Sequence, residues 1–316
     1  MDTEESLKIY INQVNEDWIV DRVRKEWIKF KNPYTKFLQF SDIVWLIAPW
    51  AWKEKSYRKL QNRKVICSVY HIDEDKFSSN DLNKFKERDK FVNAYHVISK
   101  NTLKQVEKLT DKKIYSIPFW INEKLWFPIN SKIDLRKKYN IDSNCFLIGS
   151  FQRDTEGSDL VSPKLSKGPD RFLEIVKKIN EKNEKTHILL AGKRRQYLIS
   201  ELEKNQINFS YYEMPPFNEL NELYNCLDLY IVSSRYEGGP QAIFECALTK
   251  TPIISTNVGV APEVLSPNSI YDMSNFDSAK PDIDYAFSNA QKYIIPNGFE
   301  NFIKMFHEVL GDQNEK

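Results

Sequence analysis

Two glutamates, Glu237 and Glu245, stand at E-x7-E spacing around a Gly-Gly-Pro sequence, a pattern that could bind a phosphorylated ligand. Pro240 is favoured at the first residue of a helix, because the N–H that it lacks would be unpaired there. The free N–H groups and positive dipole of that helix favour an anion, and Gly238 and Gly239 let the backbone approach it. A carboxylate can accept hydrogen bonds from vicinal hydroxyls. We therefore expect a diphosphate between two hydroxyl-binding acids, as in a nucleotide-sugar.

Two basic residues could stand opposite such a diphosphate. Arg153 follows the run Leu147-Ile-Gly-Ser150, which reads as a strand, and Lys167 is expected to start the next helix. Open α/β sheets bind ligands beyond the carboxyl ends of their strands. Cations placed there could stabilise a departing diphosphate without a metal ion. Two alternatives stay open at this point. Arg153 and Lys167 could be solvated charges at loop ends, and the segment with Glu237 could be an ordinary strand–turn–helix whose glutamate interacts with the helix dipole.

The N-terminal half offers weaker signals. His71 ends a strand-like run and can accept or donate a hydrogen bond near neutral pH, although it could also merely end the strand. Trp50 and Trp52 could form a platform on which a sugar ring stacks, or fill a core. Six Lys and Arg residues follow between positions 53 and 64. This strip could contact an anionic lipid surface or a phosphate-linked acceptor, or be a solvated helix face.

Strand-like and helix-like segments alternate along the chain in two series, which predicts an α/β protein with two doubly wound parallel sheets. The first series of strands is expected at 7–11, 43–47, 64–70, 95–99 and 113–117, and the second at 145–149, 186–191, 207–211, 227–232 and 252–255. We expect an N-terminal domain at 1–140 and a ligand-binding domain at 141–270. A C-terminal segment at 271–316 should end in an amphipathic helix, 300–310, that returns to the first domain.

Composition excludes several classes of protein. The chain has 316 residues, 41% of them hydrophobic, and 46 Lys and Arg against 44 Asp and Glu, so neither a disordered polyelectrolyte nor a nucleic-acid binder that relies on bulk charge is expected. Residues 1–130 hold 24 basic and 18 acidic residues and all seven tryptophans. Four cysteines without a CxxC pair predict neither a disulfide scaffold nor a zinc site. The acidic start lacks a hydrophobic segment, so we expect a cytoplasmic protein without a signal peptide.

From about Phe146 to Leu265 the chain resembles the donor-binding domain of family-4 retaining glycosyltransferases, the glycosyl transferases group 1 family of GT-B fold. The features that carry the resemblance occur in the family's order. They are the segments 149–153, 167–168, 189–192, 227–234, 237–245 and 251–264. The resemblance covers somewhat less than half of the chain and implies two facing Rossmann-like domains with a cleft between them.

The resemblance also implies roles for individual residues. Glu237 would contact the hydroxyls of the donor sugar, Glu245 those of the ribose, and Arg153 and Lys167 the departing diphosphate. His71 matches the family's acceptor-side histidine. Further donor contacts would come from glycines and backbone groups, namely Gly149, Gly192, Gly238, Gly239, Pro240, Gln241 and Ala242. The nucleobase would lie near 211–215.

The implied activity is a metal-independent, retaining transfer of a sugar from a UDP- or GDP-linked donor. The acceptor would be a glycan or lipid-linked hydroxyl in polysaccharide biosynthesis. We expect no cofactor and no nucleic-acid partner. The protein could contact the inner surface of the membrane. The family's pattern is interrupted by an insertion at 155–166 and by Gly239, where the family often has a bulky apolar residue.

Three alternative functions follow from other features. D-x-D sequences occur at 73–75 and 282–284, and such pairs hold a divalent cation in the other large glycosyltransferase fold. Sugar-nucleotide epimerases share the two-domain fold, and fold does not determine function. A non-catalytic sugar-binding module could keep the fold without turnover. Sensitivity to EDTA, epimerisation without an acceptor, and donor binding without turnover would distinguish them.

Overall fold

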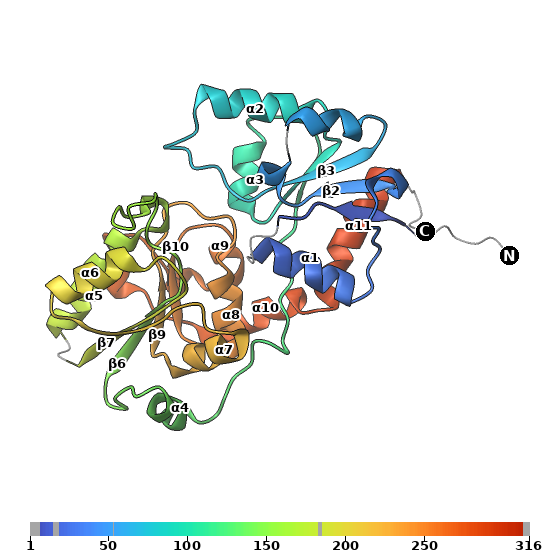
Figure 1. The fold of residues 1–316 in the computed structure, drawn as a ribbon. Coiled ribbons are helices and arrows are strands. Elements are labelled where there is room, and N and C mark those ends of the chain that lie inside the picture. The colour runs from blue at the N-terminus through green and yellow to red at the C-terminus, as the bar shows by residue number, and fades with distance from the viewer. Residues whose placement is uncertain (1–6, 15–18, 53, 183–184, 312–316) are drawn as a thin grey trace. The chain divides into compact units, whose positions relative to one another are not determined.

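A computed structural model describes residues 7–14, 19–52, 54–182 and 185–311, and divides the chain into two compact units (Figure 1). Unit 1 comprises residues 1–120 and 295–316, and unit 2 comprises residues 121–294. Each unit is built on one parallel β-sheet. The predicted α/β class with two doubly wound sheets is therefore confirmed.

Unit 1 has a five-stranded sheet in the order β1-β2-β3-β4-β5. Its strands are β1 (Ile9–Ile11), β2 (Ile43–Leu46), β3 (Lys64–Val69), β4 (Ala94–Val97) and β5 (Ile114–Ser116). The helices are α1 (Ile19–Lys29), α2 (Ser79–Asp89), α3 (Lys100–Val106) and, from the C-terminus, α11 (Glu300–Leu310). Side chains of α1 and α11 pack on one face of the sheet, and those of α2 and α3 pack on the other.

Tryptophans fill the face of the unit 1 sheet that α11 covers. Trp27, Trp45 and Trp120 are almost completely buried and contact Phe302 of α11 at ring-centroid distances of 5.1–6.4 Å. Their N–H groups are paired, for example that of Trp120 with a carboxylate oxygen of Glu26 at 2.9 Å. The large rings supply the apolar surface that holds the C-terminal helix in unit 1.

Unit 2 has a six-stranded parallel sheet in the order β11-β10-β9-β6-β7-β8. Its strands are β6 (Phe146–Ser150), β7 (Thr186–Ala191), β8 (Asn208–Tyr212), β9 (Leu229–Val232), β10 (Ile253–Thr256) and β11 (Ile270–Tyr271). Its helices are α4 (Lys132–Lys138), α5 (Pro169–Lys182), α6 (Gln196–Lys204), α7 (Phe217–Cys226), α8 (Gln241–Thr249), α9 (Ala261–Val264) and α10 (Ile283–Ala290). Numbered within the unit, the strand order is 3-2-1-4-5-6, the order of a Rossmann fold.

Alternate side chains of the unit 2 strands enter two separate cores. Leu147 and Leu189 pack with α7 and α8 on one face, whereas Ile148 and Leu190 pack with α5 and α6 on the other. Both faces of these strands are buried, which explains why the strands read as continuous apolar runs. Figure 1 shows the two helical layers of the unit.

All ten expected strands are present, with ends that differ by at most two residues, and the strand at 186–191 has the expected bounds. The boundary differs from the expected 140/141, since residues 121–140 lie in unit 2, where Trp126 and Leu135 are buried and Arg136 donates to Asp228 at 2.6 Å. Within the expected C-terminal segment, residues 271–295 were interpreted as polar and irregular, which was wrong. This segment contains α10, whose small residues Ala286 and Ala290 allow close packing in the core beside α8.

A few expectations fall on residues that the structure does not describe. Trp18, Asn15 and Lys53 lie outside the described residues, and so does the acidic N-terminus at 1–5. Among the described helices, none is long and apolar enough to cross a membrane. The four cysteines are free and buried.

Candidate functional site

The loops after β6 and β9 meet where the strand order of unit 2 reverses. From β6 the chain moves outward through β7 and β8, and it then returns to β9 on the other side of β6. The chain therefore continues to one side of the sheet after β6 and to the other side after β9. In open α/β sheets the crevice that binds ligands lies at this point, at the carboxyl ends of the strands. Arg153 and Lys167 lie in the first loop, and Glu237 lies in the second.

The loop between β9 and α8 is fixed by its neighbours through backbone and hydroxyl groups. The amides of Arg235 and Tyr236 donate to the Ser166 carbonyl at 2.8 and 3.1 Å. The hydroxyl of Thr256, at the end of β10, donates to the Ser234 carbonyl at 2.7 Å. The loop after β6 and the end of β10 thus set the path of this loop, which presents Glu237 from a rigid backbone.

Two glycines allow this close packing. Gly168 has φ +62°, and a Cβ at this position would lie 1.9 Å from the carbonyl oxygen of Ser233. Gly259 has φ +50°, and its Cβ would lie 2.2 Å from the carbonyl oxygen of Gly238. No side chain fits at either distance, and both backbones are left-handed. Gly238 and Gly239 are not among the glycines with positive φ, so their φ angles do not require glycine.

Lys167 and Glu237 form an ion pair in the crevice. The Lys167 ammonium contacts Oε1 of Glu237, and their side chains are 18% and 10% exposed. The Lys167 carbonyl accepts a hydrogen bond from Nε2 of Gln152 at 2.9 Å, and the hydroxyl of Ser234 donates to Oε1 of Gln152 at 3.3 Å. Gln152 and Ser234, which the sequence analysis did not single out as site residues, therefore connect the two loops at this ion pair.

Three cations gather on the β6 side of the crevice. The Lys164 amide donates a hydrogen bond to the Asp154 carbonyl at 2.7 Å. The Lys164 carbonyl accepts one from the Lys167 amide at 2.8 Å. Burial lowers the pKa of Lys164, and the positive charges of Lys167 and Arg153 lower it further. Burial and the charge of Arg194 lower the pKa of Arg153. Two acids oppose these three cations, since Glu237 pairs with Lys167 and Glu156 raises the pKa of both Lys164 and Arg153, so the cluster keeps one positive charge in excess.

Lys164 was missed in the sequence because it lies in the insertion at 155–166. The insertion folds back on itself, with an antiparallel bridge between Thr155 and Pro163, which brings Lys164 beside residue 154. Lys167 ends a short 3-10 turn, Leu165–Lys167, and does not start a helix, since α5 begins at Pro169.

Helix α8 begins at Gln241, with Pro240 as the preceding cap residue rather than the first helical residue. Glu245 lies one turn further on and is only 6% exposed. The hydroxyl of Tyr224 donates to Oε2 of Glu245 at 2.7 Å, which orients the carboxylate. Ala242 is in the first turn of the same helix.

The glycines at 149 and 192 have local structural reasons. A Cβ at Gly149 would lie 2.4 Å from a methyl group of Leu227. Gly192 follows β7 with φ +89°, and its carbonyl accepts a hydrogen bond from the Tyr211 hydroxyl at 2.9 Å. Their roles in donor binding stay predictions.

The residues predicted to act on an acceptor lie in unit 1. His71 is exposed just beyond the carboxyl end of β3, and Trp50 is exposed beyond β2 with its ring 5.5 Å from that of Tyr70. Ser99 caps α3, its side chain accepting from the Thr102 amide at 3.2 Å. From the sequence, Ser99 could belong to a serine-rich turn of the kind found in the family or simply cap a helix, and the contact is that of a cap. Arg63, from the basic strip, donates to the Gln39 and Ser41 carbonyls.

No cluster of three or more His, Cys, Asp or Glu side chains that could hold a metal ion occurs within the described ranges. In the second D-x-D sequence, Asp282 caps α10, because its side chain accepts a hydrogen bond from the Tyr285 amide at 3.1 Å. This contact gives Asp282 a structural role.

Comparisons with known proteins identify the fold. Residues 162–300 match the family model "Glycosyl transferases group 1". Anabaena Alr3699/HepE, solved with UDP and glucose, is 11% identical with TM-score 0.74, covering 96% of this chain and 100% of that one. A Rickettsia africae glycosyltransferase is 16% identical, with TM-score 0.64 and coverage of 99% and 100%. Sucrose-phosphate synthase of Thermosynechococcus elongatus is 14% identical, with TM-score 0.63 and coverage of 96% and 78%.

No curated protein sequence matches the chain. At the identities of the solved structures, the likeness shows the fold alone. That fold is GT-B, which confirms the expected fold class of two Rossmann-like domains.

Proposed function

We propose that the chain, which has a GT-B fold and matches the glycosyl transferases group 1 model at residues 162–300, is a family-4 glycosyltransferase that transfers a sugar with retention of configuration. The donor is a UDP- or GDP-linked sugar, and the acceptor is a hydroxyl of a glycan or a lipid-linked saccharide. The reaction belongs to polysaccharide biosynthesis in the cytoplasm and needs no metal ion.

One observation carries this proposal. At the switch point of the unit 2 sheet, Arg153, Lys164 and Lys167 gather beyond the carboxyl end of β6, where Lys164 and Lys167 interact with Glu237 in the loop before α8. Excess positive charge and an N-terminal helix end both favour an anion with at least two charges. The carboxylate beside them favours hydroxyl groups on the same ligand. A nucleoside diphosphate sugar has both parts.

The Lys167–Glu237 ion pair suggests how the donor enters. The two charges neutralise each other in this pair. A donor diphosphate would compete for Lys167, because two phosphate groups carry more charge than one carboxylate. Glu237 would then accept hydrogen bonds from the sugar hydroxyls. Donor binding thus replaces the ion pair with a contact between Lys167 and the diphosphate and with hydrogen bonds from sugar hydroxyls to the Glu237 carboxylate.

Bond breaking produces charge on the leaving diphosphate, and the chain's cations stabilise it. As the bond between the anomeric carbon and the diphosphate oxygen breaks, negative charge grows on that oxygen beside Arg153, Lys164 and Lys167. The acceptor hydroxyl attacks from the same face of the sugar, and its proton passes to the leaving phosphate oxygen. No nucleophile from the protein is required. This step rests on the family resemblance.

A thermal-shift screen against UDP, GDP and ADP tests donor binding, since a ligand that binds only the folded state raises the melting temperature. We expect one of the first two to stabilise the protein. The Glu237→Ala and Arg153→Ala variants should lose most turnover while their circular dichroism stays that of the wild type. Near-wild-type rates in both variants would refute the site assignment.

Product analysis tests the reaction type. NMR of the product should show the donor's anomeric configuration, and excess EDTA should leave the rate unchanged. Conversion of the donor to an epimer without an acceptor would instead identify an epimerase. Donor binding without turnover over a panel of acceptors would identify a non-catalytic module.

A further inference from the structure

Two phenylalanines of unit 1 are exposed side by side. Phe37 is 57% exposed and Phe40 is 61% exposed, and their rings contact edge to face with centroids 5.9 Å apart. Together they leave on the order of 200 Å² of aromatic surface in water. A pair of this kind on the surface of a folded unit indicates an interaction site more often than a single exposed ring does.

The local backbone explains why both rings point outward. Residues Leu38–Phe40 form a 3-10 turn, closed by a hydrogen bond from the Phe40 amide to the Phe37 carbonyl at 3.1 Å. Residues three apart eclipse each other in such a turn, so Phe37 and Phe40 share one face. Leu38 packs against the core of unit 1 instead. The turn is therefore anchored by one apolar residue and presents two others.

A basic segment is attached to the same turn. Arg63 donates to the carbonyls of Gln39 and Ser41 at 2.8 and 2.9 Å, which ties the turn to the chain entering β3. Four other cations, at neighbouring positions in the sequence of these two segments, are exposed. They are Lys36, Arg58, Lys59 and Lys64. One exposed acid, Asp42, follows the turn and accepts a hydrogen bond from the Lys8 amide at 2.7 Å.

We propose that Phe37 and Phe40, with Lys36, Arg58, Lys59 and Lys64, form a docking surface for an anionic lipid bilayer. Aromatic rings enter the interface between headgroups and acyl chains, and Lys and Arg around them are attracted to anionic headgroups. Neither contribution alone holds a protein firmly, but the two together do. The surface would bring the enzyme to a membrane without any spanning segment.

Vesicle co-sedimentation of the full chain tests this proposal. Vesicles of phosphatidylglycerol and phosphatidylcholine in equal parts are compared with vesicles of phosphatidylcholine alone. We expect binding to the first only, and a decrease as salt is raised. A Phe37→Ser/Phe40→Ser variant should bind more weakly by at least about tenfold. Arg58→Glu/Lys59→Glu should weaken binding by at least about 25-fold, at roughly fivefold for each cation lost, and the new negative charges add to the loss.

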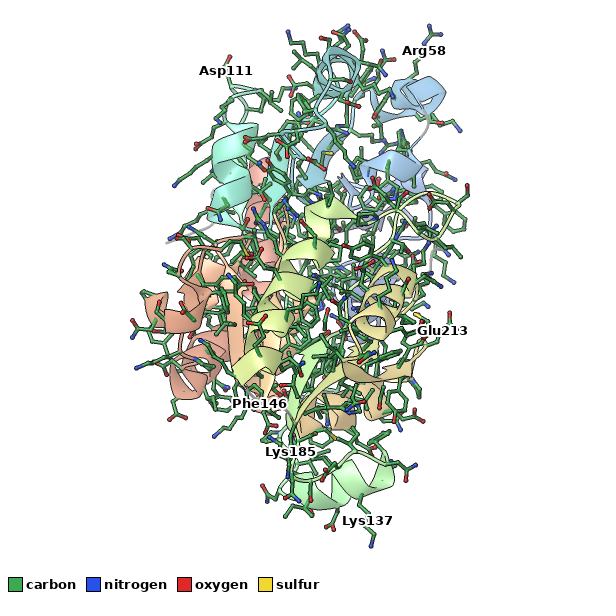
Figure 2. All side chains as sticks on the ribbon, turned by 90° about the vertical axis from the view of Figure 1, so that its left-hand side faces the viewer. Arg58, Asp111, Lys137, Phe146, Lys185 and Glu213 are labelled. Atoms are coloured by element: carbon green, nitrogen blue, oxygen red, sulfur yellow. The ribbon has the colours of Figure 1, made fainter. Side chains whose placement is uncertain are left out.

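Two matched controls come from unit 2. Ile133 is 71% exposed, and Lys137 is exposed and points outward at the surface, as Arg58 also does (Figure 2). Ile133→Ser removes an exposed apolar side chain and Lys137→Glu reverses an exposed positive charge, but both lie in unit 2, outside the proposed surface. They should therefore leave vesicle binding unchanged. Thermal melting of each variant shows whether it is folded.

Several outcomes would overturn the proposal. They are no binding of the wild type to anionic vesicles, equal binding to both kinds of vesicle, and retained binding in both surface variants. A fourth is a wild-type dimer that the Phe37→Ser/Phe40→Ser variant dissociates while its vesicle binding persists, because the phenylalanines would then pair two copies of the chain.

Discussion

Replacing Gly168 with alanine would place a methyl carbon 1.9 Å from the carbonyl oxygen of Ser233. Ordinary contact begins at 3.4 Å, so one of the two backbones must move by about 1.5 Å. The left-handed φ of +62° adds strain of roughly 1 kcal/mol for a residue with a Cβ. The Ser233 segment leads directly into the loop that carries Glu237.

Such a displacement should be visible in catalysis. A misplacement of 1 Å at a reacting centre can lower the rate about 100-fold. We therefore expect Gly168→Ala to lower kcat/KM for the donor by about 100-fold or more. UDP release and the UDP-induced thermal shift measure turnover and binding, with GDP used if the screen identifies it instead.

Gly311 is the matched control. It also has a positive φ, +91°, but a Cβ there would meet nothing within 4 Å, and it lies after α11 in unit 1. Gly311→Ala should therefore keep donor turnover near the wild-type rate. If Gly168→Ala does not fold, Thr256→Val loosens the same loop without adding atoms, because it removes the 2.7 Å hydrogen bond to the Ser234 carbonyl. A folded Gly168→Ala protein with wild-type donor kinetics would refute the assignment of this loop.

Three further variants test separate parts of the chain. Lys164→Gln should weaken UDP binding about tenfold, whereas Lys185→Gln should not, because Lys185 (labelled in Figure 2) directly precedes β7 at the amino end of the strands. Equal affinities of wild type and Lys164→Gln in calorimetry would place Lys164 outside the site. Glu245→Gln should reduce the preference for UDP over 2′-deoxy-UDP, and an unchanged preference would contradict contact with the ribose. Burial lowers the pKa of His96 to about 4, so its neutral form stabilises unit 1 above pH 6.5 and this contribution, about 3 kcal/mol, is lost as the pH falls toward 4. The free energy of unfolding, measured with urea at pH 7 and at pH 4.5, should differ less between the two pH values in His96→Gln than in the wild type. Equal differences in the two proteins would contradict a role of His96 in the pH dependence of stability.

Local sequence determined most of the elements and the central part of the site. Apolar runs of four to six residues gave strands with both faces buried, because parallel sheets bury both faces. Gly-Gly-Pro between two glutamates predicted a loop followed by a helix, and Arg153 and Lys167 were found because they follow a strand and precede a helix. These signals depend on residues that are neighbours in the sequence.

The tertiary structure decided which distant residues meet. Lys164 was not recognised because its place beside Arg153 depends on the fold of the insertion. Trp126 belongs to unit 2 because of what it packs against, not because of its neighbours in the sequence. Gly168 and Gly259 are needed because the backbone at 233–238 passes within van der Waals distance of both. Helix α10 was missed for the same reason, since its small residues form a buried face only when α8 is there to cover them. A sequence states preferences over a few residues, whereas the steric and electrostatic environment of a side chain is set by segments that only folding brings together.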